Sequence, residues 1–169
     1  MNHHPRPNPT RGYTLIEVLI VVAILGVVSA AVVPSMLAAG TMGVQAAARV
    51  IVADLLYAQN EAIAHQATRA VVFEPDENRY RLVDENEQTL TASWINGKAN
   101  NYLVNFSNDS RFEGVTLVSA DFGDGHRIAY DDIGTPTTGG TVLIEYGEHE
   151  YRIDVASFTG RVTVTRLDE

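Results

Sequence analysis

Four aspartates within twelve residues form the densest group of side chains that could do chemistry. Asp121, Asp124, Asp131 and Asp132 lie in the stretch DFGDGHRIAYDD. Paired carboxylates can transfer protons or bind calcium. Their spacing does not fit an EF-hand loop, which alternates its ligands and ends in a glutamate. We therefore expect solvated turn residues here, with calcium binding as the open alternative.

The sequence contains no recognisable catalytic or metal-binding motif. It has no cysteine, so a thiolate nucleophile, a thiolate metal site and disulfides are excluded. No serine lies in a G-x-S-x-G context, and the GDG and GG stretches lack the helix and lysine that follow a phosphate loop. His126 and His149 have no second ligand at metal spacing. We therefore expect that the protein is not an enzyme and binds no cofactor or metal.

One further carboxylate, Glu17, lies at the start of a long apolar run. Residues 18–39 carry no charge, and the next charged residue is Arg49. Such a run can cross a hydrocarbon core of about 30 Å. A carboxylate inside a bilayer costs about 2.5–3.5 kcal/mol and normally has a partner. The chemistry expected of Glu17 is therefore charge pairing.

The apolar run has three competing interpretations. A cleaved secretory signal needs a shorter apolar region that ends in small residues, for which residues 29–31 (SAA) are the candidates. A plain signal anchor fits the length and the positive charges of Arg6 and Arg11, but it leaves Glu17 unexplained. The third interpretation is a family resemblance.

The stretch RGYTLIEVLIVVAILGVV, which begins at Arg11, resembles the N-terminal signature of type IV pilins and pseudopilins. The resemblance implies that prepilin peptidase cuts after Gly12 and methylates the new amino terminus at Tyr13. Glu17 is then the fifth mature residue, where the family places its glutamate. Pro34 lies where these proteins commonly carry a helix-kinking proline. Tyr13 departs from the usual phenylalanine, a change we expect to be tolerated.

The resemblance also implies a role in assembly for Glu17. Its carboxylate would neutralise the α-amino group of Tyr13, four residues away in the same helix or in a neighbouring subunit. The alternative is a glutamate that extends to the membrane interface. The implied partners are prepilin peptidase, other pseudopilins or minor pilins, and an inner-membrane assembly platform. The implied location is the inner membrane with the C-terminal domain in the periplasm, followed by incorporation into a pseudopilus.

Helical character continues beyond the apolar run. Residues 41–69 are rich in good helix formers. Apolar residues recur there at spacings of three or four and predict one buried face: Val44, Ala48, Ile51, Leu55, Ala58 and Ala62. Asp54, Gln59, Asn60 and Glu61 are expected mostly off that face, His65 is expected at the helix C-terminus, and Pro34 is expected to kink or locally unwind the helix. A helix over residues 13–66 would be about 80 Å long.

After residue 68 the hydrophobic period changes from 3.6 to 2. AVVFEPDENRYRLVDE predicts two strands joined by the turn EPDEN. Further strands are expected in NYLVNF, VTLVSA, RIAYD, TVLIEY, EYRIDVA and RVTVTRL, the last two with half-buried alternation that includes Val162 and Val164. We therefore predict a head of six to eight antiparallel strands packed on the second half of the helix.

The C-terminal pattern IAYDDIGTPTTGGTVLIEY…YRIDVASFTGRVTV resembles the H-type pseudopilin of type II secretion and a minor type IV pilin of the same domain family. The resemblance implies an α+β pilin-like fold: a leader (1–12), a transmembrane and assembly helix (13–39), an amphipathic helix (40–67) and a β head (68–169). It implies a structural subunit of a pseudopilus for protein secretion, with a minor type IV pilin in pilus biogenesis or DNA uptake as the alternative. Much of the stretch 84–109 takes no part in this resemblance.

Charge argues against nucleic acid as a partner. The net charge is −9, and the candidate cations Arg161 and Arg166 are followed by Asp168 and Glu169. Phosphate binding depends on clustered lysine and arginine, so capture of DNA should be weak. Trp94 is a candidate exposed aromatic on a loop, with a core or edge position as the alternative.

Overall fold

The computed structural model describes residues 13–92, 100–123 and 125–167, and within these it leaves the side chains of residues 31–41 and 100 undescribed. The chain divides into two compact units, Met1–Leu37 and Ala38–Glu169, and each is described by itself. One helix, α1 (Leu15–His65), contributes residues to both units. The helix assignment is continuous through Pro34, so no local unwinding is present there, and the kink stays a prediction.

In the second unit, α1 buries the face that its apolar spacing predicts. All six predicted residues are buried, and Ala47 joins them. The helix ends at His65, after which Gln66 adopts a left-handed conformation with φ of 48°. The amide of Gln66 bonds the carbonyl of Ile63, and the amide of Ala67 bonds that of Ala62, which is the Schellman pattern of a helix C-terminus.

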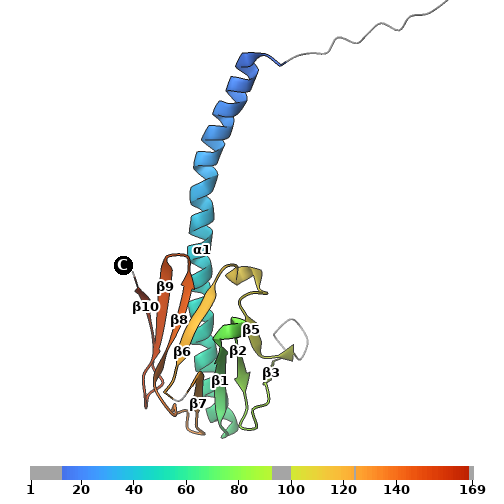
Figure 1. Ribbon diagram of the computed structural model, residues 1–169. Helices are drawn as coiled ribbons and strands as arrows, with labels where there is room; N and C mark the ends of the chain where they lie inside the picture. Colours follow the sequence, from blue (N-terminus) through green and yellow to red (C-terminus); the bar gives the residue numbers. More distant parts are fainter. Residues whose placement is uncertain (1–12, 93–99, 124, 168–169) are drawn as a thin grey trace, which may run out of the picture. The chain divides into compact units, whose positions relative to one another are not determined.

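Two four-stranded sheets and a two-stranded ribbon make up the head (Figure 1). The first sheet has the order β5-β2-β1-β7, the second β10-β9-β8-β6, and β3 pairs with β4. Every pairing among the described residues is antiparallel. The strand bounds are β1 Arg69–Glu74, β2 Arg79–Val83, β3 Thr91–Ala92, β4 Asn100–Asn101, β5 Leu103–Asn105, β6 Thr116–Asp121, β7 Arg127–Tyr130, β8 Gly140–Tyr146, β9 His149–Val155 and β10 Val162–Leu167.

The described residues form ten strands, so the prediction of six to eight is wrong. The additional strands are short and come from residues 84–109. The expected strand NYLVNF divides at Tyr102 into β4 and β5, because the Tyr102 amide bonds the carbonyl of Leu90 while its own carbonyl bonds the amide of Leu82. These bonds to two different segments interrupt a regular ladder with a single neighbour.

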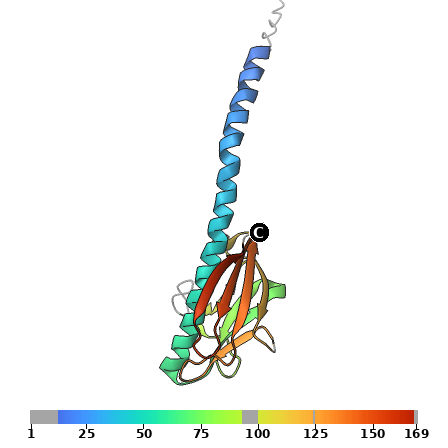
Figure 2. The same cartoon turned by 90° about the vertical axis from the view of Figure 1, so that its left-hand side faces the viewer.

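The core lies between the second-unit part of α1 and both sheets. Figures 1 and 2 show the two sheets on the same side of this helical segment. One buried cluster contains residues of α1 and of both sheets, including Ile51, Leu55, Tyr80 and Ile153. A chain of ring contacts extends through it, with 5.4 Å between the Phe73 and Tyr80 centroids. Such contacts add to the stabilisation that burial of the rings provides.

Asn78, in the predicted EPDEN turn, connects the two sheets. It adopts a left-handed φ of 50° after the short 3₁₀ helix η1 (Pro75–Glu77). Its Nδ2 donates to the carbonyl of Val115 at 2.9 Å, and its Oδ1 accepts from the amide of Leu117 at 2.7 Å. One turn residue just before β2 thereby anchors Val115 and Leu117, at the start of β6 in the second sheet.

Two glycine turns contact α1 close to Gln59. Gln59 Nε2 donates to the carbonyl of Gly134 at 2.7 Å. Gly134 has φ of 82°, and a Cβ atom there would lie 2.6 Å from the Ile63 Cδ1 atom. Gly160 has φ of 66°, and a Cβ atom there would lie 2.9 Å from Gln59 Nε2. Both turns therefore require glycine for conformation and for space.

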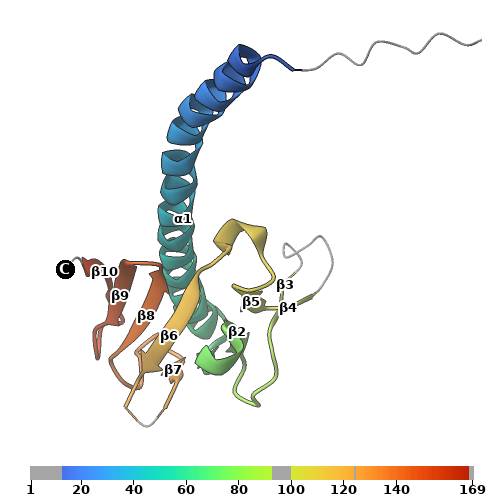
Figure 3. The same ribbon diagram turned by 45° about the horizontal axis from the view of Figure 1, so that its top comes forward.

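Strand β10 does not show the predicted half-buried alternation. Val164 is 43% exposed, although it pairs with the fully buried Ile153 of β9. The reason is position: β10 is an edge strand of its sheet, as Figure 3 shows. A side chain at a sheet edge can share the buried face of its neighbour and still remain accessible to solvent.

Candidate functional site

In the first unit, the predicted assembly residues lie at the start of α1. The amide of Glu17 bonds the Thr14 hydroxyl at 3.3 Å and the Thr14 carbonyl at 3.1 Å. Thr14 therefore acts as an N-cap, and Glu17 occupies the third helical position, where a carboxylate also favours the helix dipole. The spacing T-x-x-E, visible in the sequence, is that of a capping box.

The apolar side chains of this helical segment are uncovered. Every large apolar residue from Tyr13 to Val28 is between 50% and 84% exposed. Monomeric soluble proteins rarely leave a patch of this size in water, so such a surface indicates contact with lipid or protein. We call residues 13–30 the apolar helix surface.

The other predictions for the N-terminus concern Gly12, Pro34 and the segment 13–39. Gly12 lies outside the described residues, and the side chain of Pro34 does too. Among the described residues, no helical stretch is both long enough and apolar enough to span a membrane. The predicted segment 13–39 includes residues whose side chains are not described, so it stays a prediction.

In the second unit, Asp54 is a buried carboxylate, which corrects the expectation that it lies off the buried face of α1. It is only 6% exposed. The Tyr80 hydroxyl donates to its Oδ2 at 2.5 Å, and the Tyr102 hydroxyl donates to its Oδ1 at 2.7 Å. These bonds offset part of the cost of burying the charge. The sequence could have indicated this position, because residue 54 lies between Ile51 and Ala58 on the predicted face.

Burial shifts the pKa values of Asp54 and of the tyrosines around it. Burial raises the pKa of Asp54 above its ordinary value, although the two tyrosine hydrogen bonds act in the opposite direction. The pKa values of Tyr80 and Tyr102 are also raised, first by burial and then by the Asp54 carboxylate. Tyr57 stacks on Tyr102 at 5.4 Å between centroids, and burial followed by Glu61 raises the pKa of Tyr57 to about 12. Perturbed groups of this kind are common at functional sites.

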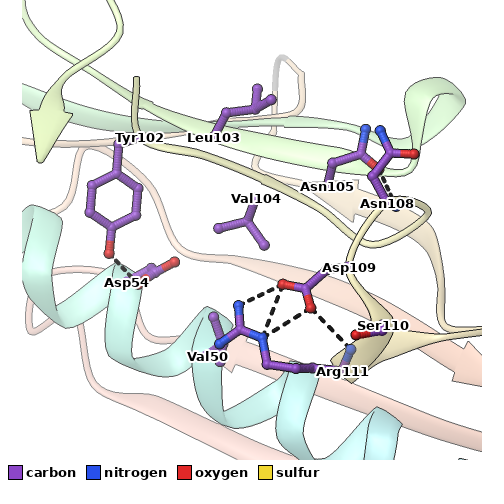
Figure 4. A pocket seen from close by; sticks show the side chains of 10 residues that line it. All are labelled: Val50, Asp54, Tyr102, Leu103, Val104, Asn105, Asn108, Asp109, Ser110 and Arg111. Carbon is purple, nitrogen blue, oxygen red and sulfur yellow. Dashed lines mark hydrogen bonds and ion pairs between the residues drawn. The ribbon is translucent and has the colours of Figure 1, made fainter. Parts of the chain in front are cut away.

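Asp54 opens onto a groove in the head, which Figure 4 shows. The groove encloses about 730 Å³. Its lining comes from α1, from Tyr102 and β5, and from the residues that follow β5: Val50, Asp54, Tyr102, Leu103, Val104, Asn105, Asn108, Asp109, Ser110 and Arg111. We call it the β5 groove.

An ion pair contributes the other charged side chains of the β5 groove. The Arg111 guanidinium bonds the Asp109 carboxylate, with 2.6 Å between Nη2 and Oδ2. The Asp109 carboxylate also accepts from the Arg111 amide at 3.0 Å and so begins the short 3₁₀ helix η2 (Ser110–Phe112). The bond from the Arg111 side chain lowers the pKa of Asp109. The two charges neutralise each other, whereas Asp54 has no ion-pair partner among the described residues.

The three described aspartates of DFGDGHRIAYDD, Asp121, Asp131 and Asp132, do not form a metal-ligand group. Asp131 is a turn residue, because its Oδ1 accepts the amides of Ile133 at 3.2 Å and Thr135 at 2.6 Å. The Asp121 Oδ1 accepts the amide of Gly123 at 3.0 Å, and Asp124 lies outside the described residues. Within the described part of the chain, no three acidic or histidine side chains form a metal-ligand group.

The remaining candidates have ordinary surroundings or fall outside the description. His65 lies in the last turn of α1 and contacts Glu61 at 3.2 Å. Arg161 is exposed, and Arg166 contacts His149 with 3.1 Å between Nη2 and Nδ1. Trp94 lies outside the described residues.

The second half of α1 packs against antiparallel sheets. The first half is apolar, begins after the N-cap Thr14 and carries Glu17 in its first turn. Together these features define a pilin-like α+β protein. Residues 7–33 match the prokaryotic N-terminal methylation motif. Residues 47–160, more than half of the chain, match the profile described as type II transport protein GspH. The chain belongs to this GspH family, which confirms the predicted resemblance. No curated protein sequence matches the chain.

Solved structures of minor pilins and pseudopilins resemble the chain at low identity. The type IV minor pilin FimU of Pseudomonas aeruginosa is 17% identical over 72% of this chain and 87% of FimU, with a TM-score of 0.50. The minor pseudopilin EpsH of the Vibrio cholerae type 2 secretion system is 18% identical over 72% of this chain and 94% of EpsH, with a TM-score of 0.47. At this identity, the similarity to FimU concerns the fold alone.

Proposed function

We propose that the chain is a minor pseudopilin, a structural subunit of a pseudopilus in a type II secretion-like machine. Prepilin peptidase removes residues 1–12 after Gly12 and methylates Tyr13. Residues 13–39 hold the chain in the inner membrane, with the head in the periplasm, until an assembly platform inserts it among other pseudopilins. No catalytic step is assigned to the chain.

The apolar helix surface carries this proposal. Its large side chains are at least half exposed, whereas the second unit buries a core of its own. Removing apolar surface from water contributes about 25 cal/mol per Å². A segment that is apolar all round gains this stabilisation only in lipid or against other helices. Membership of the GspH family and the match to the methylation motif support the same conclusion.

Within this proposal, Glu17 fixes the offset between neighbouring subunits. Cleavage after Gly12 creates a cationic amine on Tyr13 at the edge of the same apolar region. A carboxylate in such a region is stabilised by a paired cation. Pro34, which lacks an amide donor, would let the helix bend as subunits pack.

Mass spectrometry and N-terminal sequencing test the processing step. The protein is recovered from membranes of cells with and without a prepilin peptidase. We expect a chain that begins at N-methylated Tyr13 only when the peptidase is present, and Gly12→Ser should retain the leader. A chain that begins at Met1 in both strains, or one cut near residue 31, would refute the proposal and favour an anchored or secreted domain.

A minor type IV pilin that acts in pilus biogenesis or DNA uptake is the second candidate, because the head shares its fold with FimU. Processing would be the same in both cases. A gel shift with duplex DNA at two salt concentrations addresses the DNA-uptake role. Salt-sensitive binding near physiological salt would favour it, while the net charge of −9 leads us to expect none.

A further inference from the structure

The β5 groove lies beside an open sheet edge. Among the described residues, β5 pairs with β2 and with no other strand, and Tyr80 of β2 is opposite Val104. Bonds from the Leu82 amide to the Tyr102 carbonyl and from the Phe106 amide to the Asn78 carbonyl fix the hydrogen-bonded positions. In an antiparallel ladder these positions alternate, so the amides and carbonyls of residues 103 and 105 face away from β2. The Asn105 carbonyl already accepts the Asn108 amide at 3.4 Å, so the groups that can pair with another strand are the amide and carbonyl of Leu103 and the amide of Asn105.

An outward-facing row of backbone groups is a template for another strand. Both Leu103 and Asn105 line the β5 groove, and Figure 3 places β5 on the side of the head opposite β10. An extended segment that pairs with β5 would therefore run along the groove. Peptide recognition by strand addition takes its affinity from such main-chain bonds and its specificity from pockets for side chains.

The groove also indicates which side chain fits it. Val50 and Val104 provide apolar wall, and Figure 4 shows the Val104 side chain directed between Asp54 and the Asp109–Arg111 pair. Because Arg111 is already paired with Asp109, Asp54 gives the lining a net negative charge. A long basic side chain matches this arrangement, since its methylene stem packs on apolar surface while its charged end reaches a carboxylate.

We propose that the β5 groove binds an extended peptide segment of a partner protein, which adds a strand to the outer edge of β5 and directs a lysine or arginine side chain toward Asp54. The site lies entirely in the second unit. It is therefore independent of leader cleavage and of helix assembly, and it would give this subunit a sequence-selective contact beyond the proposed stacking role.

A peptide titration tests both parts of the proposal. The ¹⁵N-labelled full chain, in micelles of a nonionic detergent, is titrated with the acetylated and amidated peptide Thr-Val-Lys-Val-Thr and followed by amide chemical shifts. A peptide with norleucine in place of lysine is the neutral control. Two further peptides, N-methylated at alternate amides, block one backbone edge each. Asp54→Asn removes the charge, and Asp76→Asn, an exposed acid in η1, is the matched control.

We expect amide shifts at Leu103 and Asn105 and a lysine peptide that binds at least about tenfold tighter than the norleucine peptide. This ratio should fall to about one in Asp54→Asn and persist in Asp76→Asn. One of the two N-methylated peptides should lose binding. No shift along β5, or equal binding by both N-methylated peptides, would overturn strand addition. An unchanged ratio in Asp54→Asn would overturn the role of the acid.

Discussion

Replacement of Asp54 by alanine should destabilise the second unit. The Tyr80 side chain is fully buried, and its hydroxyl donates to Asp54 at 2.5 Å. A buried hydroxyl left without a partner costs about 1–3 kcal/mol. The Tyr102 hydroxyl lies at the β5 groove, where water can replace its lost acceptor, so its contribution is smaller. The expected loss in the free energy of unfolding is about 2 kcal/mol.

Replacement of Asp54 by asparagine should behave differently. The amide oxygen can accept from one tyrosine hydroxyl, while the amide nitrogen donates to the oxygen of the other. Asparagine also removes a buried charge that no cation of the described residues neutralises. Near neutral pH we therefore expect a stability equal to or above that of the unmodified chain.

The pH dependence gives a second, independent signature. Burial raises the pKa of Asp54 above its ordinary value of 3.8, so the folded chain keeps this proton to a higher pH than the unfolded chain. The stabilisation linked to this proton is complete below pH 3.8 and is lost as the pH rises through the raised pKa. As the pH rises from 3.8 through the raised pKa, the free energy of unfolding of the unmodified chain should fall relative to that of Asp54→Asn.

Urea unfolding of the full chain in nonionic detergent, followed by the near-ultraviolet circular dichroism of the tyrosines, measures both effects. The unmodified chain, Asp54→Ala and Asp54→Asn are compared at pH 4, 5.5 and 7. If the Asp54→Ala chain were as stable as the Asp54→Asn chain, the hydroxyls of Tyr80 and Tyr102 would not need this acceptor. A stability difference between the unmodified chain and Asp54→Asn that is constant with pH would refute the raised pKa.

Three further substitutions test separate parts of the structure. Gly134→Ala should lower the midpoint of urea unfolding more than Gly147→Ala. Both positions have positive φ, but only at Gly134 would a Cβ atom press on Ile63. The difference between the two variants in the free energy of unfolding, about 1–3 kcal/mol, therefore measures the clash. Tyr130→Phe should keep or raise stability by about 1 kcal/mol, since its buried hydroxyl has no hydrogen-bond partner among the described residues; a loss above 1 kcal/mol would reveal a partner. The Glu17→Ala chain should still insert in the membrane but should not be incorporated into filaments, as measured by cross-linking in the filaments sheared from cells. Normal incorporation would contradict the assembly role.

Hydrophobic period was enough to predict much of the fold. The buried face of α1 and the strands β1, β2 and β6 to β9 lie where the spacing of apolar residues places them. Each of these elements buries one face against a single core, so local sequence carries the signal. Strand β10 deviates because its exposure depends on where the sheet ends, and Val164 carries no local sign of that position.

Elements defined by distant hydrogen bonds could not be predicted in the same way. Asn78 was expected only as part of a turn, yet its side chain contacts Val115 and Leu117, which lie 37 and 39 residues further along the chain. The division of NYLVNF at Tyr102 likewise depends on Leu82 and Leu90. No periodicity within a short window encodes which remote backbone groups a residue will meet.

Asp54 was misplaced for a different reason. Its position, three residues after Ile51 and four before Ala58, put it on the buried face, but its charge favoured an exposed position. The compensating groups, Tyr80 and Tyr102, follow 26 and 48 residues later. A charged residue on a predicted buried face therefore indicates that polar partners exist elsewhere in the chain, even when the sequence does not identify them.

Glu17 and Asp54 present the same electrostatic problem with different solutions. Asp54 is a carboxylate in an apolar core, and its own chain supplies two hydroxyl donors. Glu17 lies in an apolar segment, and among the described residues its carboxylate forms no hydrogen bond or ion pair, while its backbone amide bonds Thr14. If that segment enters lipid or a filament, its carboxylate needs a cation, and none of the described residues pairs with it. Cleavage after Gly12 would create one on Tyr13, so the processing step and the requirement of Glu17 for a partner are two consequences of one arrangement.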